Sequence, residues 1–229
     1  MPMPEVLART PFRFLGCIEL REILGVRARD ERELMELIEQ VPASSIYYHT
    51  HSIFLRHHRV PGAYPNDFAN WVAGQVGDQV LGERLAVIDP FEFPDLEQLR
   101  EELVSDIAEH ISALHPVPRV VFGEPFFFVQ SHVAEVPLDI EVRSLAEFHR
   151  AVQAVDASSI YFHMLEARVR RGKRHGDFVE WLEEALGLTT QAEQVARINP
   201  YLGGLERIRS EILRVLEAMS GEEAVTHAP

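Results

Sequence analysis

Internal similarity between the two halves of the chain constrains its fold more than any other feature. When the 229-residue sequence is shifted by 114 positions, residues 12–49 align with residues 126–163 without a gap. Ser-Ser-Ile-Tyr-Tyr-His at 44–49 then lies opposite Ser-Ser-Ile-Tyr-Phe-His at 158–163. Such self-similarity at one fixed spacing is the sequence signature of a repeated structural unit.

The match continues along both halves with two small changes of spacing. The Asp-Phe-x-x-Trp segment that begins at 67 aligns with the one that begins at 177, and Asp-Pro-Phe at 89–91 aligns with Asn-Pro-Tyr at 199–201. The sequence therefore predicts a tandem duplication. Its parts are copies at 12–114 and 122–219, a proline-containing linker at 115–121, and loose termini at 1–11 and 220–229.

Hydrophobic spacing predicts the same elements in each copy. Phe12 and Phe14, like Phe126 and Phe128, alternate as in a strand, and a second apolar stretch follows in both copies. Apolar residues at helical spacing then recur until each copy ends. The predicted fold class is α+β and mainly helical, with a short strand pair followed by about five helices in each copy.

Polar residues mark the predicted helix starts. Asp30 with Glu33, and Ser144 with Glu147, have the spacing of a capping box. Matched helices later in each copy are predicted to start on N-cap aspartates, Asp67 and Asp177.

Composition argues against several classes of function. The formal net charge of −14 disfavours general binding to nucleic acid or anionic lipid. No apolar stretch approaches the ~20 residues that span a bilayer, so no membrane association is expected. The opening residues do not form a secretory leader, and the single cysteine, Cys17, can form no internal disulfide. These features predict a cytoplasmic protein.

Three motifs carry a family resemblance: Ser-Ser-Ile-Tyr-x-His at 44–49, Asp-Phe-x-x-Trp at 67–71, and (Asp/Asn)-Pro-(Phe/Tyr) at 89–91. With their repeats in the second half, they resemble an uncharacterised prokaryotic family catalogued only as a domain of unknown function. Gly176 stands where the family has asparagine before the aspartate, which weakens a polar role for that position. The resemblance implies the architecture and carries no known activity.

The candidate ligand-binding residues of the two halves are a histidine, an aspartate and a tryptophan at matched positions: His49, Asp67 and Trp71, then His163, Asp177 and Trp181. A hydrogen bond between histidine and aspartate could orient an imidazole for acid–base chemistry. The alternative is a histidine that ends a helix and bonds to a loop. The tryptophans and their aromatic neighbours could line a pocket, although aromatic residues at helical spacing more often form the core.

Two further groups of side chains could bind an ion. Arg168, Arg171 and Arg174 belong to the densest positive cluster, which could hold an anion or offset the negative end of a helix that stops near Gly172. Histidines on the 44–58 helix lack the i, i+4 spacing of a metal pair, so no metal or other cofactor is predicted. His49 with His51 is the weak alternative.

Two hypotheses for function remain open. The first is a non-enzymatic protein-interaction or regulatory module that binds an unknown protein partner or forms a homodimer. Its support is a repeated helical unit without a phosphate loop, a nucleophile elbow or a Cys-x-x-Cys pair. The second is an enzyme, or a protein that binds a metal or small ligand, with a site around His49, Asp67 and Trp71.

Overall fold

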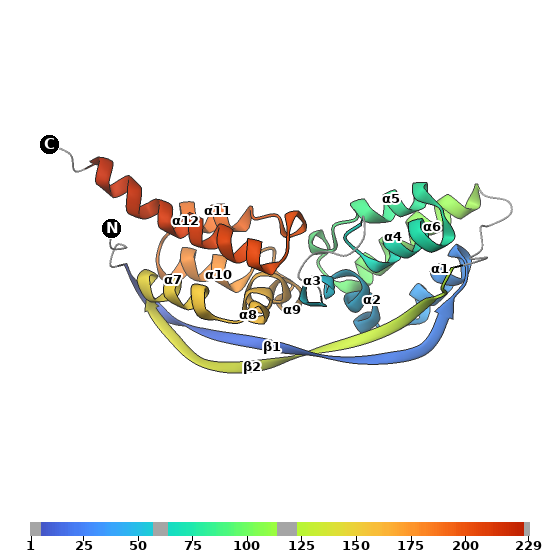
Figure 1. Cartoon of the computed structure of the whole chain (residues 1–229), viewed down its shortest axis with the longest axis horizontal. Coiled ribbons are helices and arrows are strands. Elements are labelled where there is room, and N and C mark those ends of the chain that lie inside the picture. Colours follow the sequence, from blue (N-terminus) through green and yellow to red (C-terminus); the bar gives the residue numbers. More distant parts are fainter. Residues whose placement is uncertain (1–5, 57–63, 114–122, 227–229) are drawn as a thin grey trace. The chain divides into compact units, whose positions relative to one another are not determined.

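The computed structural model of the chain describes residues 6–56, 64–113 and 123–226 (Figure 1). Within these ranges the protein is α+β, with most residues in helices and one two-stranded antiparallel sheet. The predicted fold class is therefore confirmed at this level. The predicted linker at 115–121 lies outside the described residues.

Two compact units divide the chain. Unit 1 consists of residues 1–18 and 135–229, and unit 2 consists of residues 19–134. Strands β1 (Leu7–Ala28) and β2 (Phe126–Ser144) each begin in one unit and end in the other. Each unit therefore contains part of both strands, and its own helices pack against that part.

The predicted strand pair within each copy is wrong. Each half of the chain contributes one long strand, and β1 pairs with β2. Gly25 and Asp139, at matched positions of the two strands, have left-handed φ angles of 74° and 54°. A two-residue hairpin turn of the commonest type needs two consecutive residues with positive φ. A single one can instead be accommodated as a local irregularity such as a bulge, so the chain continues in the same strand.

Helices of unit 2 enclose a core built on β2. They are α1 (Glu31–Gln40), α2 (Ala43–Thr50), α3 (Ile53–Arg56), α4 (Asp67–Trp71), the π-helix η1 (Val72–Val76), α5 (Gln79–Val87), the 3₁₀ turn η2 (Pro90–Glu92) and α6 (Leu96–Ser112). Leu34 of α1 and Leu103 of α6 belong to the same buried cluster as Phe126 and Phe128 of β2. Alternating phenylalanines thus turn one face of the strand toward the helices.

Helices of unit 1 pack in the same way on β1. They are α7 (Leu145–Ala154), α8 (Ala157–Tyr161), the π-helix η3 (Phe162–Glu166), α9 (Ala167–Arg171), α10 (Asp177–Glu180), the π-helix η4 (Trp181–Ala185), α11 (Thr189–Ala196), the 3₁₀ turn η5 (Pro200–Leu202) and α12 (Leu205–Thr226). Phe12 of β1 has ring contacts with Phe148 and Phe178 at 5.7 and 5.4 Å between centroids. Among the described residues, no helix combines the length and hydropathy needed to span a bilayer.

Both predicted capping boxes are confirmed. The Glu33 amide donates to Asp30 Oδ1 at 2.8 Å, and the Glu147 amide donates to Ser144 Oγ at 3.2 Å. Each glutamate carboxylate in return accepts from the backbone amide of the residue before the cap. These reciprocal bonds satisfy amides of the first turn that have no partner inside the helix.

The predicted N-caps at the two matched aspartates are wrong by one residue. Asn66 caps α4, because its Oδ1 accepts from the Ala69 amide at 2.8 Å. Gly176 precedes α10 and provides no side-chain cap. Asp67 and Asp177 are the first residues of these helices, and their carboxylates bind histidines instead.

Candidate functional site

In unit 2, the imidazole of His49 joins two helices to a strand. Its Nδ1 lies 2.9 Å from Asp67 Oδ2 at the start of α4, and its Nε2 accepts from the Val129 amide of β2 at 3.1 Å. A backbone amide can only donate, so Nε2 must carry the lone pair and Nδ1 the proton. The neutral Nδ1–H tautomer is therefore fixed by its partners, and neither ring nitrogen is left for another ligand.

His163 has the same set of partners in unit 1. Its Nδ1 lies 2.8 Å from Asp177 Oδ2 of α10, and its Nε2 accepts from the Leu15 amide of β1 at 2.9 Å. The same tautomer follows from the same reasoning. The structure thus brings together both candidate histidine–aspartate pairs.

Burial favours the neutral form of both imidazoles. His49 is 3% exposed and His163 is 2% exposed. Removal from water lowers the pKa of each histidine below 6.5, and this effect outweighs the aspartate hydrogen bond, which would raise it. Burial alone would raise the pKa of Asp67, but the hydrogen bond from His49 and the charge of Arg56 lower it below its ordinary value.

Arginines complete the surroundings of each aspartate. In unit 2, Arg56 Nη2 donates to Asp67 Oδ2 at 2.7 Å and to the Tyr48 carbonyl oxygen at 3.0 Å. Its guanidinium lies 4.1 Å from the centre of the Tyr48 ring. Each of these contacts holds the guanidinium of Arg56 against the protein. Asp67 therefore has an imidazole on one side and a guanidinium on the other.

In unit 1, Asp177 pairs with Arg170, which aligns with Arg56, and with Arg171 of the predicted positive cluster. Arg170 Nη2 lies 3.4 Å from Asp177 Oδ2, and Arg171 Nη1 lies 3.2 Å from Asp177 Oδ1. Arg171 also pairs with Glu180 at 2.8 Å. An external anion would have to compete with these internal carboxylates for the guanidinium groups.

The remaining members of the cluster lie at the end of α9. Gly172 ends this helix with a φ of 57°, as predicted for a residue in the C′ position. Arg168 is half-buried in α9, and Arg174 is exposed in the turn that follows. Basic side chains in the last turn of a helix offset the negative end of its dipole.

Both candidate tryptophans are buried, and each indole donates a hydrogen bond from a helix to a backbone carbonyl in or next to a strand. Trp71 Nε1 donates to the Glu124 carbonyl oxygen, and Trp181 Nε1 donates to the Thr10 carbonyl oxygen, each at 2.8 Å. They are 7% and 6% exposed. Their indole rings therefore add to the cores of the two units, with the polar edge satisfied by backbone.

A cavity of about 300 Å³ opens beside the His163 pair in unit 1. Its lining includes Phe12, His163, Arg170, Arg171, Asp177 and Trp181. This volume is at the lower end of the range for small-molecule sites. All candidate residues of unit 1 except Arg168 and Arg174 thus border one cavity.

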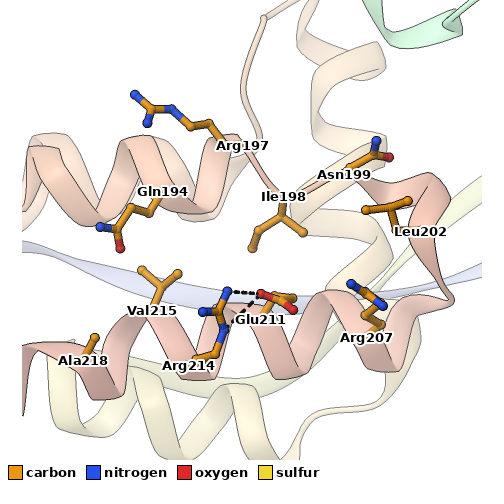
Figure 2. Close-up of a pocket in the computed structure, with 10 residues that line it drawn as sticks. All are labelled: Gln194, Arg197, Ile198, Asn199, Leu202, Arg207, Glu211, Arg214, Val215 and Ala218. Carbon is orange, nitrogen blue, oxygen red and sulfur yellow. Dashed lines mark hydrogen bonds and ion pairs between the residues drawn. The ribbon is translucent and has the colours of Figure 1, made fainter.

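A second cavity in unit 1, of about 620 Å³, lies between α11 and α12 (Figure 2). Arg197, Arg207 and Arg214 line it together with Ile198 and Leu202. Arg214 is paired with Glu211 of the same helix. This cavity could not be predicted from the sequence, because its lining comes from two helices and a turn without any motif.

The structure does not assemble a metal site from His49 and His51. The Nε2 lone pair of His49 accepts from Val129, so a metal ion would have to displace a buried backbone amide. His51 is 2% exposed, its Nδ1 lies 2.9 Å from Thr50 Oγ1, and its ring stacks on Tyr47. A different group of possible ligands, missed by the sequence analysis, lies in unit 2: Glu31, Asp78 and His110.

Gly176 has a steric role beside the His163 pair. A Cβ atom there would lie against the carbonyl oxygens of His163 and Met164, at 2.8 Å from the second. We therefore expect Gly176→Ala to lower the free energy of unfolding by about 1–3 kcal/mol, because backbone must move to make room. Chemical denaturation measures the loss. Gly74→Ala is the control, since a Cβ there meets nothing within 4 Å, and equal stability of the two variants would contradict the explanation.

One family model and one solved structure are similar to this chain. Residues 9–217 match the model of DUF5752, a family of unknown function. No curated protein matches the chain. A solved structure described as OrfY from Thermoproteus tenax is similar, with 31% sequence identity, a TM-score of 0.79, and coverage of 94% of this chain and 98% of that one. The chain therefore belongs to the DUF5752 family of unknown function.

Proposed function

We propose that this protein is a non-enzymatic protein-interaction or regulatory module. The main support is that both ring nitrogens of His49 and of His163 are bonded inside the protein. Acid–base catalysis requires an imidazole to exchange a proton with a substrate. Here that exchange would break a bond to a buried backbone amide or to an aspartate. The residues best suited to chemistry instead hold strands onto helices.

Exposed apolar side chains on the strands of unit 2 support an interaction surface. Leu20, Ile23 and Val26 of β1 are 58%, 75% and 37% exposed, and Phe127 of β2 is 48% exposed. Large apolar side chains gathered on one element are typical of surfaces that bind another protein. The proposed partner is an unknown protein or a second copy of this chain. The net charge of −14 makes a nucleic acid less favourable.

The proposal includes a tandem duplication with copies at 12–114 and 122–219. Its support is the alignment of the two halves and the similar bonding of the two histidines, which pair with an aspartate of a later helix and a strand amide. Two fused copies would give one chain two similar surfaces, as in other repeat proteins. The cytoplasmic location is likewise a proposal, based on composition.

The test removes apolar surface without removing strand-forming residues. Leu20→Thr/Ile23→Thr is expected to weaken binding to a protein partner, or self-association, at least tenfold, because threonine suits a strand but replaces apolar surface with a hydroxyl. Analytical ultracentrifugation measures self-association, and quantitative mass spectrometry compares partners bound by wild type and variant.

The matched control is Val80→Thr/Val87→Thr on α5 of the same unit. Val80 and Val87 are 63% and 82% exposed, so the same kind of change is made away from the strands. Wild-type binding is expected in this control. The proposal fails if the strand variant and the helix variant bind the same proteins, and form the same oligomers, as the wild type.

A further inference from the structure

Three potential metal ligands meet in unit 2, away from the histidine–aspartate pair. Glu31 is the first residue of α1, Asp78 is the N-cap of α5, and His110 lies in the last turn of α6. One ligand atom from each lies within 4.8 Å of the other two. His110 Nε2 and Asp78 Oδ2 are 2.8 Å apart. Three elements distant in sequence thus direct an imidazole and two carboxyl groups at one point.

Glu31 is the member of this group that calls for an explanation. Its side chain is 0% exposed, and both carboxylate oxygens lack a hydrogen-bond donor among the described residues. A buried carboxylate without a donor or a cation is costly. Burial, the neighbouring charge of Asp78 and a hydrogen bond between the two carboxyl groups raise the pKa of Glu31 to about 7. The site therefore favours a positive charge, supplied either by a proton on Glu31 or by a metal ion.

We propose that Glu31, Asp78 and His110 bind one divalent transition-metal ion of the zinc type, with water completing its coordination. Bonds of 2.0–2.2 Å in a tetrahedral zinc site place neighbouring ligand atoms about 3.3–3.6 Å apart. The three ligand atoms lie within 4.8 Å of one another, so no separation has to change by more than about 1.5 Å to reach that arrangement. An imidazole beside the carboxylates favours zinc or iron over magnesium or calcium.

The second oxygen of Asp78 supports the same geometry. Asp78 Oδ1 accepts from the Leu81 amide at 2.9 Å as the cap of α5, which leaves Oδ2 directed at His110. A metal-binding carboxylate is commonly fixed in this way by a second hydrogen bond. This site departs from the sequence-based prediction of no cofactor, and it does not depend on the interaction surface proposed above.

The other half of the chain shows that the fold does not need these polar residues. In the sequence alignment, the positions of Glu31, Asp78 and His110 correspond to Leu145, Leu188 and Met219. Leu145 is 0% exposed, and Leu188 begins α11 without a side-chain cap. In that half of the chain, all three of these positions hold apolar residues. Polar residues at all three in unit 2 are therefore consistent with one shared function.

The test is zinc binding by the full chain, purified without a histidine tag and stripped with a chelator. Calorimetry with Zn²⁺ alone is expected to give one site per chain, and bound zinc is expected to raise the melting temperature. Glu31→Gln is expected to weaken binding at least 100-fold, because it removes a charged ligand while keeping the shape. His149→Gln is the matched control, since His149 pairs with Glu217 on another surface and its loss is expected to leave affinity unchanged.

A second variant keeps the proposal testable if Glu31→Gln does not fold. Glu31→Leu/Asp78→Leu/His110→Met copies the apolar residues of the other half, and it is expected to fold and to bind no zinc. The proposal is overturned if the stripped wild type takes up no stoichiometric zinc. It is also overturned if a folded variant, Glu31→Gln or the triple change, binds zinc as the wild type does. Either result would mean that a proton shared between Glu31 and Asp78, and not a metal ion, balances the buried charge.

Discussion

Replacing Asp67 by alanine is expected to lower the free energy of unfolding by about 2–4 kcal/mol. The change removes the acceptor of His49 Nδ1–H and the counter-ion of Arg56, whose side chain is only 10% exposed. Breaking a buried pair costs about 3–5 kcal/mol because the partner charge stays behind. Asp67 itself is 22% exposed, which reduces the loss. Chemical denaturation of the full chain measures it.

The neighbouring asparagine provides the control for this change. Asn66→Ala removes the true cap of α4 and the bond from Asn66 Nδ2 to the Leu85 carbonyl oxygen, and we expect it to cost about 1–2 kcal/mol. Asp67→Asn keeps the shape of the side chain and is expected to fall between wild type and Asp67→Ala. If Asp67→Ala costs no more than Asn66→Ala, the contacts of Asp67 with His49 and Arg56 contribute little to stability.

Stability is expected to fall as the pH drops below about 6.5, and the two buried histidines are the cause. The pKa values of His49 and His163 are lowered in the folded protein, so the unfolded chain binds more protons as acid is added. Each histidine then contributes a loss of up to about 1.4 kcal/mol per pH unit, until the pH reaches its folded pKa. The lowered pKa of Asp67 adds a loss only below its ordinary value of 3.8.

Denaturation at pH 7.5 and at pH 5.5 measures this effect. Glu31 acts in the opposite direction, because its pKa is raised to about 7 and its protonated folded form gains stability as the pH falls toward 4.5. The comparison is therefore made in a Glu31→Gln background. His49→Gln and His163→Gln are each expected to remove one histidine's share of the slope. An unchanged slope in both variants would mean that folding does not lower the pKa of these histidines.

Helices and their starts could be predicted because they depend on local sequence. The capping boxes at Asp30 and Ser144 follow from a fixed spacing of three residues, and both are present. Strand pairing could not be predicted in the same way. The partner of β1 lies more than 100 residues away in β2, and apolar alternation shows which face of a strand is buried without showing its neighbour.

The N-cap that was wrongly predicted at Asp67 depends on contacts with residues distant in sequence. Asn66 and Asp67 are adjacent and both suit an N-cap, so sequence alone could not choose between them. The choice depends on His49, which comes from another helix and takes the Asp67 carboxylate. The group of Glu31, Asp78 and His110 could not be predicted for a related reason. Its members come from three helices, and only the packing of α1, α5 and α6 brings them together.

The nitrogen-15 chemical shifts of the imidazoles decide most directly whether His49 and His163 are structural residues. At pH 6.0 an ordinary histidine is roughly three-quarters protonated. Both of these histidines are expected to remain neutral at that pH, with the proton on Nδ1 and with Nε2 shifted as an unprotonated acceptor, because burial lowers their pKa and a backbone amide occupies Nε2. Cationic imidazoles at pH 6.0, or rapid exchange of the Nδ1 proton with water, would contradict this and return both residues to the candidates for acid–base chemistry.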